Sequence, residues 1–131
     1  MNKYKTTERH FKIFQEECLK WLKRFGLFFD YEIEFRHVFF TLKAEAMVEY
    51  NVEDRWAVIY LRPTWNDTVL NTFSIKRAAF HEACELLLGK LNTLAENDSV
   101  NVQDVNEATH KIIRVLEQAF WFITTDKKDK E

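Results

Sequence analysis

The stretch AAFHEACELLLGKL, residues 78–91, contains three side chains that could do chemistry together. They are His81, Glu82 and Glu85, set in an otherwise apolar run. A helix turns by about 100° per residue, so Glu85 lies about 40° and Glu82 about 100° from His81 around its axis. The three side chains therefore share one arc. An imidazole and two carboxylates are ligand types that zinc accepts in proteins.

The surroundings of this arc predict that it is buried. Between Ala78 and Leu88 no other residue is strongly polar, so the helix is apolar nearly all round and is expected at the centre of the core. An unpaired carboxylate is costly to bury. The arc must then face a metal, a cation, a water-filled cleft or a hydrogen-bonding network. In the metal-free alternative, such a network joins His81 and Glu85 to His110 or an arginine.

The segment that precedes the motif predicts a helix and then a strand. From an N-cap at Thr6 or Thr7, apolar residues recur at helical spacing as far as Phe25, and Gly26 ends the helix. In residues 31–36 apolar and charged side chains alternate, which is typical of a strand with one face in water.

Two further strands and two helices are expected after this. Residues 44–50 and 55–62 predict a hairpin, so the sheet should be an antiparallel meander of about three strands without a parallel pair. Thr72 or Ser74 is expected to cap the motif helix, and a last helix should follow from about residue 102. The predicted fold class is α+β: an N-terminal helix, the meander, and then two helices.

Length and charge limit the classes of protein that fit. The chain has 131 residues, and we expect a single domain over residues 1–125 and a charged, disordered tail over 126–131. Its 19 Lys and Arg against 21 Asp and Glu create no field of one sign, which disfavours a nucleic-acid partner. The sequence shows no signal peptide or membrane span, so we expect a cytoplasmic protein with no membrane partner. Cys18 and Cys84 are expected to be free thiols.

Three segments resemble a known family. They are WLKRFGLFFDYEIEFRH (21–37), AAFHEACELLLGKL (78–91) and NEATHKIIRVLEQAF (106–120). Together they resemble the small zincin-like metallopeptidases encoded by bacteriophages and prophages, in which a helix and a short meander precede an HExxH helix and one more helix. The resemblance spans most of the chain. HEACE stands where that family has HExxH, so the second histidine of the motif is missing.

The resemblance implies roles for individual residues. His81 matches the first zinc ligand, Glu82 matches the general base, and Glu85 occupies the position of the second histidine. The third ligand is expected on the last helix, where we choose His110 and keep Glu107 as the alternative. Because a carboxylate at Glu85 adds negative charge, it lowers the Lewis acidity of zinc. We therefore expect zinc to be absent or substoichiometric.

Three functions remain open from the sequence. We prefer a catalytically weakened or inactive zincin-like accessory protein of phage type, which binds a host or phage protein in the bacterial cytoplasm. The second function is a zinc-dependent peptidase in which His81, Glu85 and His110 bind the metal and Glu82 activates water. The third is a small protein without a site, in which exposed aromatic residues of the first or last helix form a homodimer.

Overall fold

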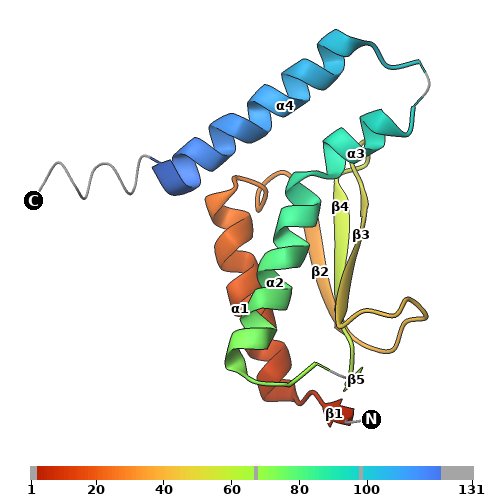
Figure 1. Ribbon diagram of the computed structural model, residues 1–131, viewed down its shortest axis with the longest axis vertical. Helices are drawn as coiled ribbons and strands as arrows, with labels where there is room; N and C mark the ends of the chain where they lie inside the picture. The colour runs from red at the N-terminus through yellow and green to blue at the C-terminus, as the bar shows by residue number, and fades with distance from the viewer. Residues whose placement is uncertain (1–2, 67, 98, 122–131) are drawn as a thin grey trace, which may run out of the picture.

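The computed structural model describes residues 3–66, 68–97 and 99–121, and their arrangement is α+β as expected (Figure 1). In chain order the elements are β1 (Lys3–Lys5), α1 (Glu8–Arg24), β2 (Glu32–His37), β3 (Ala46–Asn51), β4 (Trp56–Leu61), β5 (Thr64–Asn66), α2 (Thr72–Leu87), α3 (Gly89–Ala95), α4 (Val102–Leu116) and the π-helical turn η1 (Glu117–Trp121). The predicted tail, 126–131, lies outside the described residues, as do the last residues of the predicted domain. More helical elements thus follow the strands than the two that were expected.

The main sheet corrects the predicted topology. Its strand order is β2-β4-β3, with β4 antiparallel to β3 but parallel to β2. The hairpin of β3 and β4 is confirmed, whereas the antiparallel meander without a parallel pair is wrong. Strand β4 buries Ala57, Ile59 and Leu61. Because it is the central strand, both of its edges are hydrogen-bonded to a neighbouring strand. The connection 38–45 is long enough to pass over one strand position, which a tight two-residue turn could not do.

A second, small sheet joins the N-terminus to the end of β4. Strands β1 and β5 pair antiparallel, with Tyr4 opposite Trp65. Beside them the buried Thr6 hydroxyl lies 2.8 Å from the carbonyl oxygen of Arg62 and 2.6 Å from Nε2 of His37. These contacts fasten the start of α1 to the ends of β2 and β4.

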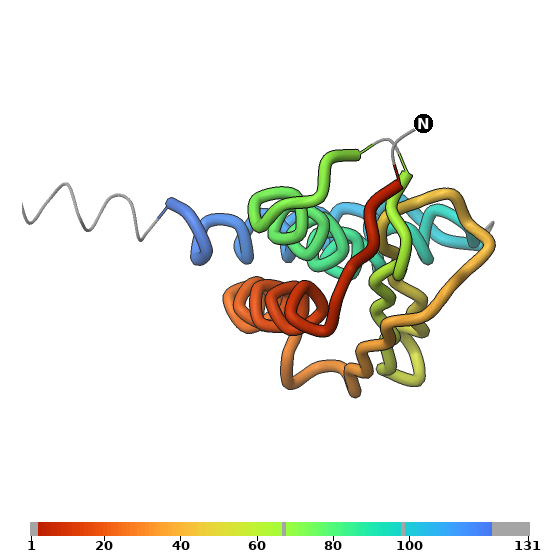
Figure 2. The backbone as a smooth tube through the Cα atoms, turned by 90° about the horizontal axis from the view of Figure 1, so that it is seen from below, coloured from red at the N-terminus to blue at the C-terminus, as the bar shows by residue number. Residues whose placement is uncertain are grey.

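Helices α1 and α2 form one layer against one face of the main sheet (Figures 1 and 2). The predicted alternation of β2 is confirmed, because Ile33 and Phe35 pack toward the core while Glu32 and Glu34 are exposed. Helix α4 crosses the ends of both helices (Figure 1). The fully buried large side chains of the core are Phe14, Leu22, Ile59, Leu61, Trp65, Ile75 and Leu86.

The ends of α1 agree with the sequence, whereas those of α2 do not. Thr7 caps α1, and Gly26 follows its C-cap with a φ of 74°, where a side chain would be strained. The cap of α2 is Asn71 rather than Thr72 or Ser74, although the Ser74 hydroxyl completes the capping box. Helix α2 ends at Leu87, so the motif segment 78–91 is not one continuous helix.

The chain is tightly packed at Gly89, where α2 ends and α3 begins. A Cβ atom on Gly89 would lie 2.9 Å from Cε2 of Tyr50, a residue of β3. The start of α3 is therefore packed directly against the sheet.

Two further expectations concern the thiols and the membrane. Cys18 and Cys84 are both free, with Cys18 buried and Cys84 half-buried. In the part of the chain that the structure describes, no helix combines the length and apolar character that crossing a bilayer requires.

Candidate metal centre

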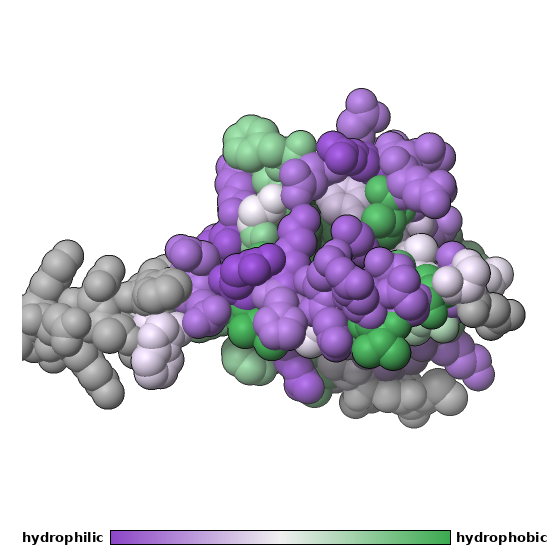
Figure 3. All heavy atoms as spheres, turned by 90° about the horizontal axis from the view of Figure 1, so that it is seen from above, coloured by the Kyte–Doolittle hydropathy of each residue, from purple (hydrophilic) through white to green (hydrophobic). Residues whose placement is uncertain are grey.

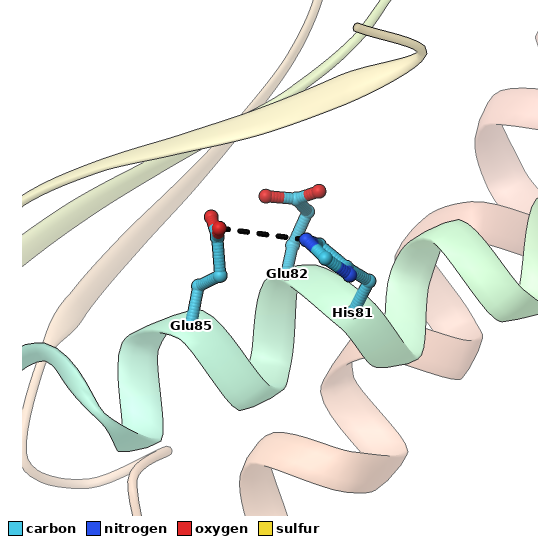
Figure 4. Close-up of side chains that lie close together, drawn as sticks. All are labelled: His81, Glu82 and Glu85. Atoms are coloured by element: carbon cyan, nitrogen blue, oxygen red, sulfur yellow. Dashed lines mark ion pairs between the residues drawn. The ribbon is translucent and has the colours of Figure 1, made fainter.

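The structure brings His81, Glu82 and Glu85 together on about one turn of α2 (Figure 4). One donor atom of each residue lies within 4.8 Å of the donor atoms of the other two. Nε2 of His81 lies 3.4 Å from Oε1 of Glu85, and the two form an ion pair when the imidazole is protonated. The predicted shared arc is therefore present.

The burial of this arc differs from the prediction. Only Glu82 is buried, with 3% of its surface exposed, whereas the side chains of His81 and Glu85 are 67% and 51% exposed. Helix α2 turns Ala79 and Ala83 into the core, and the opposite face is in solvent. His81 and Glu85 lie on that outer face, while Glu82 lies at the boundary where the helix meets the core.

Glu82 is an unusual carboxyl group. Its Oε1 atom is buried and has no hydrogen-bond partner among the described residues. Burial, reinforced by the neighbouring charges of Glu85 and Glu45, raises the pKa of Glu82 to about 8. The side chain is thus protonated at neutral pH unless a cation stabilises its charged form.

A pocket of about 380 Å³ adjoins this carboxyl group, and we call it the Glu82 pocket. Among the residues that line it are Glu45, Trp65, Phe73, Arg77, His81 and Glu82. Nε1 of Trp65 is buried and, like Oε1 of Glu82, has no hydrogen-bond partner in the described part of the chain. A donor and an acceptor without partners therefore border one pocket. Buried polar groups are rarely unpaired, so these two mark the pocket as a place for a polar ligand or an ion.

The residues expected to supply the third ligand lie elsewhere. His110 is exposed on α4, and its Nδ1 atom lies 2.8 Å from the carbonyl oxygen of Asn106 on the same helix. Glu107 is exposed beside it, and both residues line a separate hollow with Lys90, Lys111 and Arg114. Among the described residues, neither joins the group on α2. Coordination of a metal by His110 or Glu107 stays a prediction.

Sequence reasoning missed two features of this site. It expected the whole arc to be buried and did not single out Glu82 as its one buried member, although the position of Glu82 at about 100° from His81 already placed it nearest to the apolar side of the helix. It also passed over Arg77 and Phe73, which lie one and two turns before His81 and line the same pocket. Neither residue belongs to a recognisable motif, so only the folded chain reveals their place.

Comparison with models of known families, with curated proteins and with solved structures found no match for this chain. The resemblance to zincin-like metallopeptidases rests on the quoted residues alone and stays a prediction.

The residues present fit a divalent cation. One imidazole nitrogen and two carboxylate oxygens are a ligand set that zinc accepts, and three protein ligands would leave a coordination position open. A bound cation would also give the buried oxygen of Glu82 the partner that it lacks. If Glu82 binds the ion, however, it cannot also serve as a free base.

Proposed function

We propose that this chain is a zincin-like protein that binds a divalent cation weakly, lacks peptidase turnover and acts by binding another protein. The observation that supports the cation site is the buried carboxyl group of Glu82, which lies in one group with His81 and Glu85 and whose Oε1 atom has no partner among the described residues. Zinc is the best candidate, because the set contains one nitrogen and two oxygen donors.

The absence of turnover follows from the two roles that Glu82 would have to fill. In a zincin-like peptidase, zinc polarises a water molecule and a separate carboxylate accepts its proton. With only α2 supplying donors, Glu82 is needed as the third ligand, and no other carboxylate of the group remains as base. The peptidase alternative therefore requires His110 or Glu107 to approach α2 and release Glu82 from the metal.

An exposed aromatic residue supports the role in protein binding. Phe73 is 75% exposed, although it lines the Glu82 pocket. Aromatic and arginine side chains are enriched where proteins bind one another, and Arg77 lines the same pocket. We propose that a host or phage protein inserts a side chain into this pocket and contacts Phe73 at its rim.

Self-association is the second candidate, supported by a different surface. Ile113, Leu116 and Trp121 are between 41% and 62% exposed and lie along the C-terminal part of α4 and η1. Sedimentation equilibrium separates this candidate from the first. A monomer would exclude it, and a dimer that dissociates in Leu116→Lys would support it.

Zinc titration of the metal-free protein tests the proposed function. The wild type is compared with Glu82→Gln, Glu85→His and His110→Ala, and casein cleavage is measured for each protein. We expect weak zinc binding by the wild type, weaker binding by Glu82→Gln, and an affinity about tenfold higher for Glu85→His, because imidazole replaces a carboxylate. His110→Ala should bind zinc as the wild type does.

The outcomes separate the alternatives. Casein cleavage by the wild type that disappears in Glu82→Gln would overturn the proposal and establish the peptidase. Loss of zinc affinity in His110→Ala would show that α4 supplies a ligand. If neither the wild type nor Glu85→His binds zinc, the cation site is refuted. Glu16→Gln is a matched control, because it removes an exposed carboxylate of α1 that lies outside the group.

A further inference from the structure

A second pocket lies beneath α4 and adjoins the hollow that contains His110, with which it shares Lys90, Ala108 and Lys111. We call it the α4 pocket. Its volume is about 460 Å³, which is within the range of small-molecule sites. It is lined by α4, by the junction of α2 and α3, by the segment after α1 and by the turn between β3 and β4.

The floor of the α4 pocket is apolar. Helix α4 turns an apolar stripe toward the body of the protein, in which Ala108 is buried and Ile112 and Val115 are half-buried. Its outward face is mostly hydrophilic (Figure 3). The apolar residues that line the pocket include Phe25, Leu27, Leu86, Leu87, Ile112 and Val115.

The charged residues that line the pocket are mostly cationic. Arg55, Lys90 and Lys111 come from three different segments, and Asp30 is the one acidic residue among the lining residues. Ion pairs in the described part of the chain are formed by other residues, so none of these three cations is neutralised by a salt bridge. An excess of positive charge beside an apolar floor favours a ligand with an anionic end and an apolar body.

Arg55 occupies a strained backbone position. Its φ is 57°, a conformation in which glycine is favoured because a Cβ atom crowds the carbonyl oxygen. The backbone is held there, since the carbonyl oxygen of Arg55 accepts a hydrogen bond of 2.9 Å from the amide of Glu32. Strain of this kind is often retained for function. Here the residue in that position is an arginine that lines the α4 pocket, whereas a glycine would supply no cation there.

We propose that the α4 pocket binds a small amphiphilic carboxylate, with its apolar chain on the floor and its carboxylate near Arg55, Lys90 and Lys111. A medium-chain fatty acid has this chemistry. Burial of apolar area on the floor stabilises the bound hydrocarbon chain of the ligand. The three cations favour a ligand with an anionic end over one with a neutral end. This site is independent of the metal centre, with which it shares no lining residue.

Isothermal titration calorimetry with three probes tests the proposal. Decanoate has both parts of the ligand, decanol lacks the charge, and acetate lacks the chain. We expect saturable binding of decanoate with a Kd below about 1 mM, binding of decanol at least about tenfold weaker, and no binding of acetate. Decanol that binds as tightly as decanoate, or decanoate that shows no saturable binding, would overturn the proposal.

Substitutions then locate the site. Arg55→Gly should weaken decanoate binding about fivefold or more while raising the melting temperature, because it removes a cation and relieves the strained φ. Poor folding cannot explain a loss of affinity in a more stable protein. Lys111→Gln should weaken binding similarly. Lys12→Gln removes an exposed lysine of α1 that does not line the pocket, and it should leave affinity unchanged. Wild-type affinity in both Arg55→Gly and Lys111→Gln would refute the assignment.

Discussion

Nε2 of His81 lies 3.4 Å from Oε1 of Glu85, one turn later on α2, and both side chains are more than half exposed. A contact of this kind on a helix surface adds little to stability, because water screens the charges and both side chains lose freedom. We predict that His81→Ala changes the free energy of unfolding by less than about 0.5 kcal/mol and lowers zinc affinity about tenfold or more. Urea denaturation and zinc titration measure the two effects. A large loss of stability would show that His81 is structural.

The raised pKa of Glu82 predicts a pH dependence of stability. Its pKa is raised from 4.5 to about 8, so the folded protein holds this proton more tightly than the unfolded chain does. The contribution of Glu82 to stability is complete below pH 4.5 and is lost as the pH rises toward 8. Glu82→Gln keeps an uncharged side chain of similar shape. At pH 8 it should be more stable than the wild type by at least about 1 kcal/mol.

Urea denaturation of metal-free protein at pH 5, 6.5 and 8 checks this prediction. The difference between Glu82→Gln and the wild type should grow with pH across this series. Glu16→Gln serves as the control, because it removes an exposed carboxylate of α1 that does not contribute to the raised pKa of Glu82. A difference that stays constant with pH would mean that Glu82 is already charged in the folded protein.

Cation binding should release the proton of Glu82. At pH 7 the carboxyl group is protonated in the metal-free protein, and it must lose its proton to bind a metal. Calorimetry of zinc binding in two buffers of different ionisation enthalpy gives the number of protons released. We predict that the wild type releases more protons than Glu82→Gln at pH 7, and that this difference disappears above about pH 9. Equal release by both proteins at pH 7 would place Glu82 outside the coordination sphere.

The close approach of Gly89 to Tyr50 predicts a conditional effect of an added methyl group. Gly89→Ala places a Cβ atom 2.9 Å from the ring of Tyr50, so it should destabilise the protein by about 1–2 kcal/mol. In a Tyr50→Ala background the clash is absent, and alanine should stabilise α3 through its higher helix propensity. Thermal unfolding of the four proteins gives the coupling between the two sites. Additive effects would contradict the steric explanation.

Local patterns predicted the elements whose form depends on neighbours in sequence. The threonine cap and Gly26 defined α1, because caps and left-handed glycines act within one helical turn. The alternation in residues 31–36 identified β2 and its buried face. The grouping of His81 with Glu85 was predictable for the same reason, since residues one turn apart on a helix are neighbours.

Features that depend on distant contacts were not predictable in this way. Strand β2 pairs with β4 because β4, the most buried strand, takes the central position of the sheet. The alternation of apolar and charged residues within one strand does not say which strand is its neighbour. The exposure of His81 and Glu85 depends on where α1 and β3 meet α2. An apolar composition around the whole motif helix concealed the side that remains in water, where Leu88 is 40% exposed.

The central position of β4 has a consequence for the order of events during synthesis. Strands β2 and β3 leave the ribosome first, but they have no ladder to each other, because each is hydrogen-bonded to β4. A nascent chain that stops at Asn51 therefore contains two of the three strands and no sheet. The sheet forms only when residues 56–61 emerge and pair with the segments of both β2 and β3, so the core-facing side of α1, which is made first, has no sheet to pack against before then.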